Sequence, residues 1–152
     1  MTEHEAFLDF LNCVRRARKE YSDTLSRFAA LDSACTRITP SWSTDGGHNG
    51  DSQSLWARRA DEATRVEEYK AAVDRAAAAL SALVDAVPDK SHRRILRLRY
   101  LRCLPWPRIC AMIAMSDRHI YRVHRQALAE LESIWTEHYK GGHHDEQTYE
   151  QG

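Results

Sequence analysis

The sequence lacks long apolar runs, closely paired cysteines and a leader-like N-terminus. It contains no stretch of about 18 apolar residues, so we expect no membrane-spanning segment. The N-terminal segment MTEHEAFLDF carries acidic residues where a secretory signal carries basic ones, and we therefore expect a cytoplasmic protein. No CxxC pair is present, which argues against a zinc site. We expect the cysteines to be small buried hydrophobic residues: Cys13, Cys35, Cys103 and Cys110.

Motifs that carry catalysis are also missing. The chain has no glycine-rich phosphate loop, no nucleophile elbow and no paired-carboxylate motif, so we expect neither an enzyme nor a cofactor. His119 and His124 lie five residues apart, which does not fit the i, i+4 histidine pair of a helical zinc site. His143 and His144 precede Asp145 in a polar tail, where such a tract is usually incidental. We expect no bound metal.

The distribution of charge is uneven, although the chain as a whole is neutral. Its 152 residues include 22 basic and 22 acidic residues. Residues 90–126 contain ten of the basic residues and a single acid, Asp117, so this segment has a formal charge of +9 and the remainder −9. A basic segment of this kind favours a polyanionic partner.

The N-terminal part of the chain shows two long helical patterns. Apolar residues recur at alternating spacings of four and three from Phe7 to about Thr36, with one arginine in the seam. Residues 37–53 are rich in Gly, Ser, Asp and Asn and predict a loop. A second helix follows to about Ala86, with its own seam from Val66 to Val87. We expect residues 1–87 to form a helical hairpin, packed on itself or as a coiled coil with a second chain.

Pro88 ends the second helix, and three shorter helices are predicted after it, at 91–103, 106–114 and from Ser116 to about Tyr139. The last two, joined by a tight turn, predict a helix-turn-helix within a domain at 89–139. Residues 140–152 are polar and expected to be disordered. The predicted small core is Ile109, Ile113 and Ile120 with Leu98 and Val123, while the buried face of the last helix continues through Ala127, Leu131 and Ile134. The fold class is therefore all-α.

The start of the last helix carries the residues that we expect to contact DNA. If Ser116 caps this helix, the side chains that follow face outward at its N-terminus, the part of a recognition helix that reaches base edges. Arginine binds guanine through two hydrogen bonds, and an acid accepts one from cytosine. Tyr121, His119 and Arg125 are expected to contact phosphates. Arginines before this helix, including Arg97 and Arg108, are expected to bind the phosphate backbone of DNA and so to add affinity that does not depend on the base sequence. Trp106 is expected to pack between helices, and His124 to pack or contact phosphate.

Residues 92–131 resemble region four of bacterial sigma factors, which recognises the −35 promoter element. The shared pattern is "RILRLRYL…LPWPRICAMIAMSDRHIYRVHRQALAEL", with a W-x-x-I helix start, an S-x-R-x-I cap and a closing A-L-x-x-L. The resemblance implies that the base-reading positions are Asp117, Arg118 and Arg122. Two of these three differ in type from that family, so the same promoter sequence is not implied.

A second resemblance covers residues 7–135 and is most specific in SDRHIYRVHRQAL. This pattern is similar to that of the small ArpU/RinA-like regulators of phages and prophages, which are thought to act on late phage genes. It implies a transcription regulator that is not a full sigma factor, because no segment resembles the regions that melt promoter DNA.

Two functional hypotheses follow from the sequence. The first is a sequence-specific regulator that binds double-stranded DNA, with the N-terminal hairpin mediating homodimerisation or contacting another protein such as RNA polymerase. The second is a coiled-coil structural or adaptor protein whose basic domain binds RNA or an acidic protein. Binding to native and scrambled DNA at two salt concentrations distinguishes them.

Overall fold

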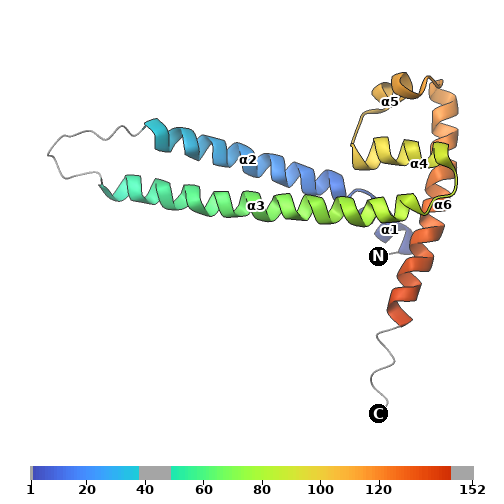
Figure 1. Cartoon of the computed structure of the whole chain (residues 1–152), viewed down its shortest axis with the longest axis horizontal. Coiled ribbons are helices and arrows are strands. Elements are labelled where there is room, and N and C mark those ends of the chain that lie inside the picture. Colours follow the sequence, from blue (N-terminus) through green and yellow to red (C-terminus); the bar gives the residue numbers. More distant parts are fainter. Residues whose placement is uncertain (1, 38–48, 145–152) are drawn as a thin grey trace, which may run out of the picture. The chain divides into compact units, whose positions relative to one another are not determined.

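The computed structural model describes residues 2–37 and 49–144, and over these residues it contains helices and turns but no strand (Figure 1). The predicted all-α fold class is therefore confirmed. Residues 38–48 of the predicted loop and residues 145–152 of the predicted disordered tail lie outside the described residues. The predicted loop at 37–53 was too long, because Arg37 belongs to the helix before it and residues 49–53 to the helix after it. The last helix was expected to end near Tyr139, but it continues to His144.

The chain divides into two compact units, and the division differs from the predicted one. The first unit is Met1–Arg15 together with Ala76–Gly152, and the second is Arg16–Arg75. We expected residues 1–87 to form one domain, separate from 89–139. Instead, both ends of that segment belong to the unit that contains the last helix. The spacing of apolar residues predicted the buried faces but did not specify what would cover them.

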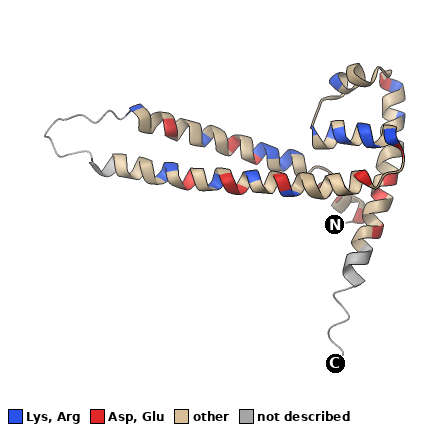
Figure 2. Ribbon diagram, in the orientation of Figure 1, with Lys and Arg blue, Asp and Glu red and all other residues tan. Residues whose placement is uncertain are grey.

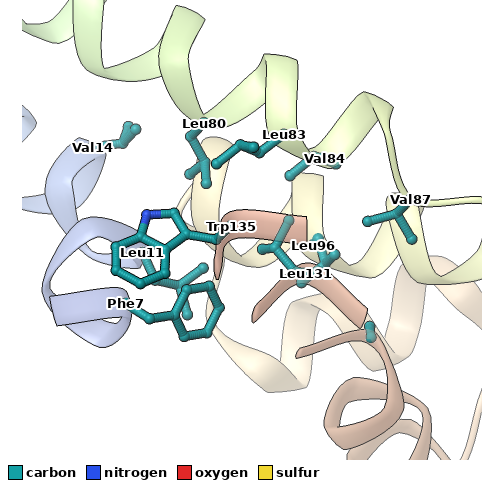
Figure 3. Close-up of a cluster of buried hydrophobic side chains, with 11 residues drawn as sticks. Phe7, Leu11, Val14, Leu80, Leu83, Val84, Val87, Leu96, Leu131 and Trp135 are labelled. Carbon is teal, nitrogen blue, oxygen red and sulfur yellow. The ribbon is translucent and has the colours of Figure 1, made fainter. Parts of the chain in front are cut away.

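The large core of the first unit explains this division. Figure 3 shows side chains of α1 (Glu3–Leu11), of the end of α3 (Asn49–Asp85) and of α6 (Asp117–His144) pointing toward one another. The Phe7 ring lies 5.8 Å from that of Trp135, measured between centroids. Eleven buried residues form this core: Phe7, Leu11, Val14, Leu80, Leu83, Val84, Val87, Leu96, Ala127, Leu131 and Trp135.

The first predicted helix is interrupted at Asn12, because α1 ends at Leu11 and α2 begins at Cys13 and runs to Arg37. The side-chain amide of Asn12 donates to the carbonyl of Leu8 at 2.9 Å, and its backbone N–H donates to the same oxygen at 3.2 Å. Asparagine competes in this way with the regular helical hydrogen bonds. The sequence prediction missed this break because it considered only Gly and Pro as interruptions.

Two histidine–carboxylate contacts fasten other helices to α6. The Nδ1 atom of His4 in α1 lies 2.8 Å from a carboxylate oxygen of Glu132. His92, in α4 (Lys90–Leu96), is buried, and its Nδ1 lies 2.9 Å from a carboxylate oxygen of Glu130. The N-terminus of α4 is capped by Asp89, which accepts hydrogen bonds from the backbone N–H groups of Ser91 and His92. These two contacts thus tie α1 and α4 to α6.

A second, smaller core holds the helices that carry the basic segment. It joins α4, the π-helical turn η1 (Arg97–Leu101), α5 (Trp106–Ile113) and the start of α6. Four of the five predicted core residues are buried here, and Ile113 is half-buried against them. The fully or nearly fully buried members are Ile95, Leu98, Ile109, Ile120 and Val123.

The connection between α5 and α6 is short and tightly bent. Ala114 ends α5 in the left-handed conformation, with φ 57° and ψ 41°. This conformation is usually occupied by glycine, because a Cβ atom makes it less favourable. Ser116 then accepts a hydrogen bond from the backbone N–H of His119 at 3.4 Å, as expected for the predicted N-cap. The turn at Ala114 and the cap at Ser116 therefore define where α6 begins next to the small core.

Candidate nucleic-acid interface

The first turns of α6 carry a cationic recess. It has a volume of about 360 Å³ and is lined by Ser116, Arg118, His119, Arg122 and Arg125. All five residues are exposed, and no acidic residue lines the recess. The N-terminal end of a helix also carries partial positive charge and unpaired N–H groups. The recess is therefore suited to a negatively charged group.

The arginines of this recess differ in how they are held. Arg122 donates a hydrogen bond from a guanidinium nitrogen to Nδ1 of His119 at 3.0 Å, so its side chain is oriented along the helix. Arg118 and Arg125 make no ion pair or hydrogen bond with the part of the chain that the structure describes. Their guanidinium groups need not break an existing contact before they bind an anion.

Asp117 is exposed, but it lies beside α5. Burial raises the pKa of the Cys110 thiol, and a hydrogen bond to Asp117 and its negative charge raise it further. The carboxylate proposed by resemblance to read a base is thus close to Cys110 and next to Arg118 in sequence.

A cluster of aromatic rings fixes α6 against η1 and α5. The Trp106 ring lies 5.4 Å from that of Tyr121 and 4.6 Å from that of His124. On its other side, the guanidinium carbon of Arg99 lies 5.0 Å from the Trp106 ring centroid. Trp106 therefore packs between helices, as predicted from the sequence. Tyr121 remains 47% exposed and contacts the cluster through its ring.

His124 lies inside this cluster rather than on the surface of α6. Its Nε2 atom is 2.8 Å from the Tyr100 hydroxyl, and the two rings stack at 5.8 Å between centroids. Burial, and to a lesser extent the charge of Arg99, lowers the pKa of His124 from 6.5 to about 4. Burial also raises the pKa of Tyr100, against the opposing effect of Arg99 and Arg15. The neutral histidine therefore has a packing role.

This lowered pKa predicts a pH dependence of stability. Between pH 6.5 and about 4, His124 is protonated in the unfolded chain but is still neutral in the folded protein. The free energy of unfolding should consequently fall as the pH decreases through this window and should level off near its lower end. Urea unfolding across the window measures this slope, which His124→Gln should reduce. His138→Gln, at an exposed position of the same helix, should leave the slope unchanged. Equal slopes in wild type and His124→Gln would contradict the assignment.

The arginines of α4 and η1 have mixed roles. Arg93 donates hydrogen bonds to the carbonyls of Val87 and Pro88, at 2.6 and 2.9 Å. Arg97 forms an ion pair with Asp85, and Arg99 donates to the carbonyl of Leu104 at 3.0 Å. These three side chains therefore bind to the segments that precede α4 and follow η1. The sequence prediction treated them as charges that bind the DNA backbone, and it offered no signal for the carbonyl partners of Arg93 and Arg99 or for the Asp85 carboxylate that pairs with Arg97.

A second cationic recess nevertheless lies on α4 and η1, with a volume of about 380 Å³. Figure 2 shows the concentration of basic residues along α4. Arg94, Arg102 and, on α5, Arg108 are exposed and make no ion pair with the described residues. The lining residues are Lys90, Arg93, Arg94, Arg97, Leu98 and Arg102. The structure thus presents two acid-free recesses in the same unit.

Other kinds of site find less support. Within residues 2–37 and 49–144, no three His, Cys, Asp or Glu side chains gather where a metal ion would fit. The tract from His143 to Glu146 lies outside the described side chains. None of the described helices combines the length and apolar character that crossing a membrane requires.

No protein-family model, curated protein or solved structure matches this chain.

Proposed function

We propose that this protein is a sequence-specific DNA-binding regulator of transcription, in which α5 and α6 act as a helix-turn-helix. The observation that carries the proposal is the recess at the start of α6. It joins three arginines to a helix N-terminus, contains no acid, and is positioned by a packed aromatic cluster. This combination supports entry of the α6 N-terminus into the major groove.

Within this proposal, the exposed side chains have different roles. Arg118 and Arg122 contact base edges, with Asp117 beside them, because arginine recognises guanine through paired hydrogen bonds. His119, Tyr121 and Arg125 contact phosphates and fix the register. Arg108 and the recess on α4, which includes Arg97, add affinity for the backbone. Since Arg97 already pairs with Asp85, Arg94 and Arg102 are the stronger contributors there.

The biological setting follows from the sequence resemblances alone. They support a regulator of late genes in a phage or prophage, with RNA polymerase as a further partner. This part of the proposal predicts a gene located close to genes for phage packaging.

Binding to duplex DNA tests the proposal directly. DNA from the gene's own neighbourhood should bind about 10³-fold more tightly than scrambled DNA of the same composition. Affinities measured at about 50 mM and about 200 mM salt should fall steeply for both, because phosphate contacts release counterions. Equal affinities for native and scrambled DNA would contradict sequence-specific binding. Tighter binding to an RNA duplex than to either DNA would instead favour an RNA-binding adaptor.

A further inference from the structure

We propose that a second copy of this chain docks on one face of the second unit, where residues 16–37 of α2 and 49–75 of α3 form a helix pair. This face, called here the alanine face, consists of Leu25, Ala29, Trp56, Ala60 and Ala63. The proposal goes beyond DNA binding and does not require it.

The contact between the two helices buries very little. The helices run antiparallel, as the ion pairs Asp32–Arg59 and Arg27–Glu62 show, at 2.7 and 3.7 Å. The seam residues alternate at spacings of three and four, but most are only half-buried. The half-buried and buried seam residues are Tyr21, Thr24, Phe28, Leu31 and Cys35 on α2, and Leu55, Arg59, Glu62, Val66 and Tyr69 on α3.

No large apolar side chain is buried among the described residues of this unit. Its buried residues are Thr24, Cys35 and Glu62. Helices of this kind obtain most of their stability from burying an apolar face. A seam built around a threonine, a cysteine and a glutamate supplies little of that burial. We therefore expect this unit to gain stability by packing against another surface.

The two sides of the helix pair differ in how many charged residues they carry. Residues that directly precede a seam position lie on one side of an antiparallel pair, and residues that directly follow one lie on the other. The preceding positions form a charged face, and several of its members line one recess with Glu62. That charged face includes Glu20, Asp23, Arg27, Arg58, Asp61, Arg65 and Glu68. Half of the following positions are apolar, and these five residues form the alanine face. The other following positions are Ser22, Asp32, Thr36, Glu67 and Lys70.

Trp56 supplies an anchor on the alanine face. Its side chain is 50% exposed, yet the guanidinium carbon of Arg59 lies 5.7 Å from its ring centroid. Arg59 is itself held by Phe28, at 5.0 Å, and by Asp32. An exposed tryptophan that is already oriented loses little conformational freedom on docking, and tryptophan is frequent at the centres of protein interfaces. Leu25, on the other helix, is 38% exposed.

The distribution of charge in the second unit favours a second copy of the chain as the partner of the alanine face. Residues 16–75 contain ten basic and ten acidic residues, so this part of the chain has no excess of either sign to attract a polyanion. Figure 2 shows both signs distributed along α2 and α3. A twofold interface needs a surface that complements itself. The charged residues on the same side as the alanine face include both signs, which such a surface requires: Arg18, Asp32, Glu67, Lys70 and Asp74. Two helix pairs joined in this way form a four-helix bundle.

The mass of the full chain in solution, measured without DNA by light scattering and sedimentation, tests the proposal. The wild type should be a dimer. Trp56→Glu and Leu25→Glu should each weaken dimerisation at least tenfold, because each places a charge in the apolar interface. Leu8→Glu is a matched control, since Leu8 is 39% exposed but lies in the first unit. It should remain dimeric, and circular dichroism should show that all three variants keep their helix content.

Two outcomes would overturn the inference. The first is a wild type that stays monomeric at concentrations up to about 0.1 mM. The second is a dimer that survives both Trp56→Glu and Leu25→Glu, or that Leu8→Glu disrupts equally, because the interface would then lie elsewhere. A dimer that does not bind DNA would leave this inference intact and contradict only the proposed function.

Discussion

Replacing Phe7 by alanine should lower the free energy of unfolding of the first unit by about 3–5 kcal/mol. Phe7 is 1% exposed, and its ring packs against Trp135 in the large core. Removing the ring leaves a cavity between α1 and α6 as well as losing buried apolar area. The effect should therefore reach α6, although Phe7 is far from it in sequence.

Denaturant unfolding combined with amide hydrogen exchange measures this effect. Exchange in α4, α5 and α6 should accelerate in Phe7→Ala, because these helices share one unit with α1. Leu8→Ala is the control: the neighbouring side chain is 39% exposed and should cost little. If Phe7→Ala accelerated exchange only in α2 and α3, the originally predicted boundary near Pro88 would be correct and the observed division wrong.

Replacing Arg118 by alanine should weaken binding to the native DNA site by about 1–3 kcal/mol and leave binding to scrambled DNA nearly unchanged. Arg118 is exposed and makes no hydrogen bond or ion pair with the described residues, so the free protein should keep its stability. Arg122→Ala should act similarly and should also release His119 from its hydrogen bond. Titrations of both variants against the two DNA sequences provide the measurement.

The matched control for these variants is Arg94→Ala, at an exposed position of the α4 recess. It should weaken binding to both DNA sequences by the same factor, as expected for a phosphate contact. Arg97→Ala is less suitable because it leaves Asp85 without its partner. If Arg118→Ala and Arg94→Ala affected the two sequences in the same way, α6 would not be the reading helix.

Much of the C-terminal fold was predictable from the sequence. The spacing of Ile109, Ile120 and Val123 predicted the small core, and Ser116 predicted the start of α6. These predictions depend on local rules, because helix periodicity and capping involve residues only a few positions apart. The candidate DNA-binding residues were found for the same reason, since they directly follow the cap.

The face of α6 beyond Ala127 was predicted less well. Ile134 was expected on the buried face with Trp135 beside it, but Trp135 is the buried residue and Ile134 is only partly buried against the core. Both positions fit a helical stripe. The rings of Phe7 and Phe10, which lie more than 120 residues earlier, pack against Trp135, and no local pattern contains that information.

The sequence by itself determined most of the helical segments, the basic segment at 90–126 and the cap at Ser116 that precedes Arg118 and Arg122. Only the tertiary structure decided which buried faces meet: that α1 covers α6, that Asp85 holds Arg97, and that His124 is enclosed by Trp106 and Tyr100. The physical reason is that periodicity specifies an apolar face without naming its partner. The partner depends on the fit of side chains from distant parts of the chain.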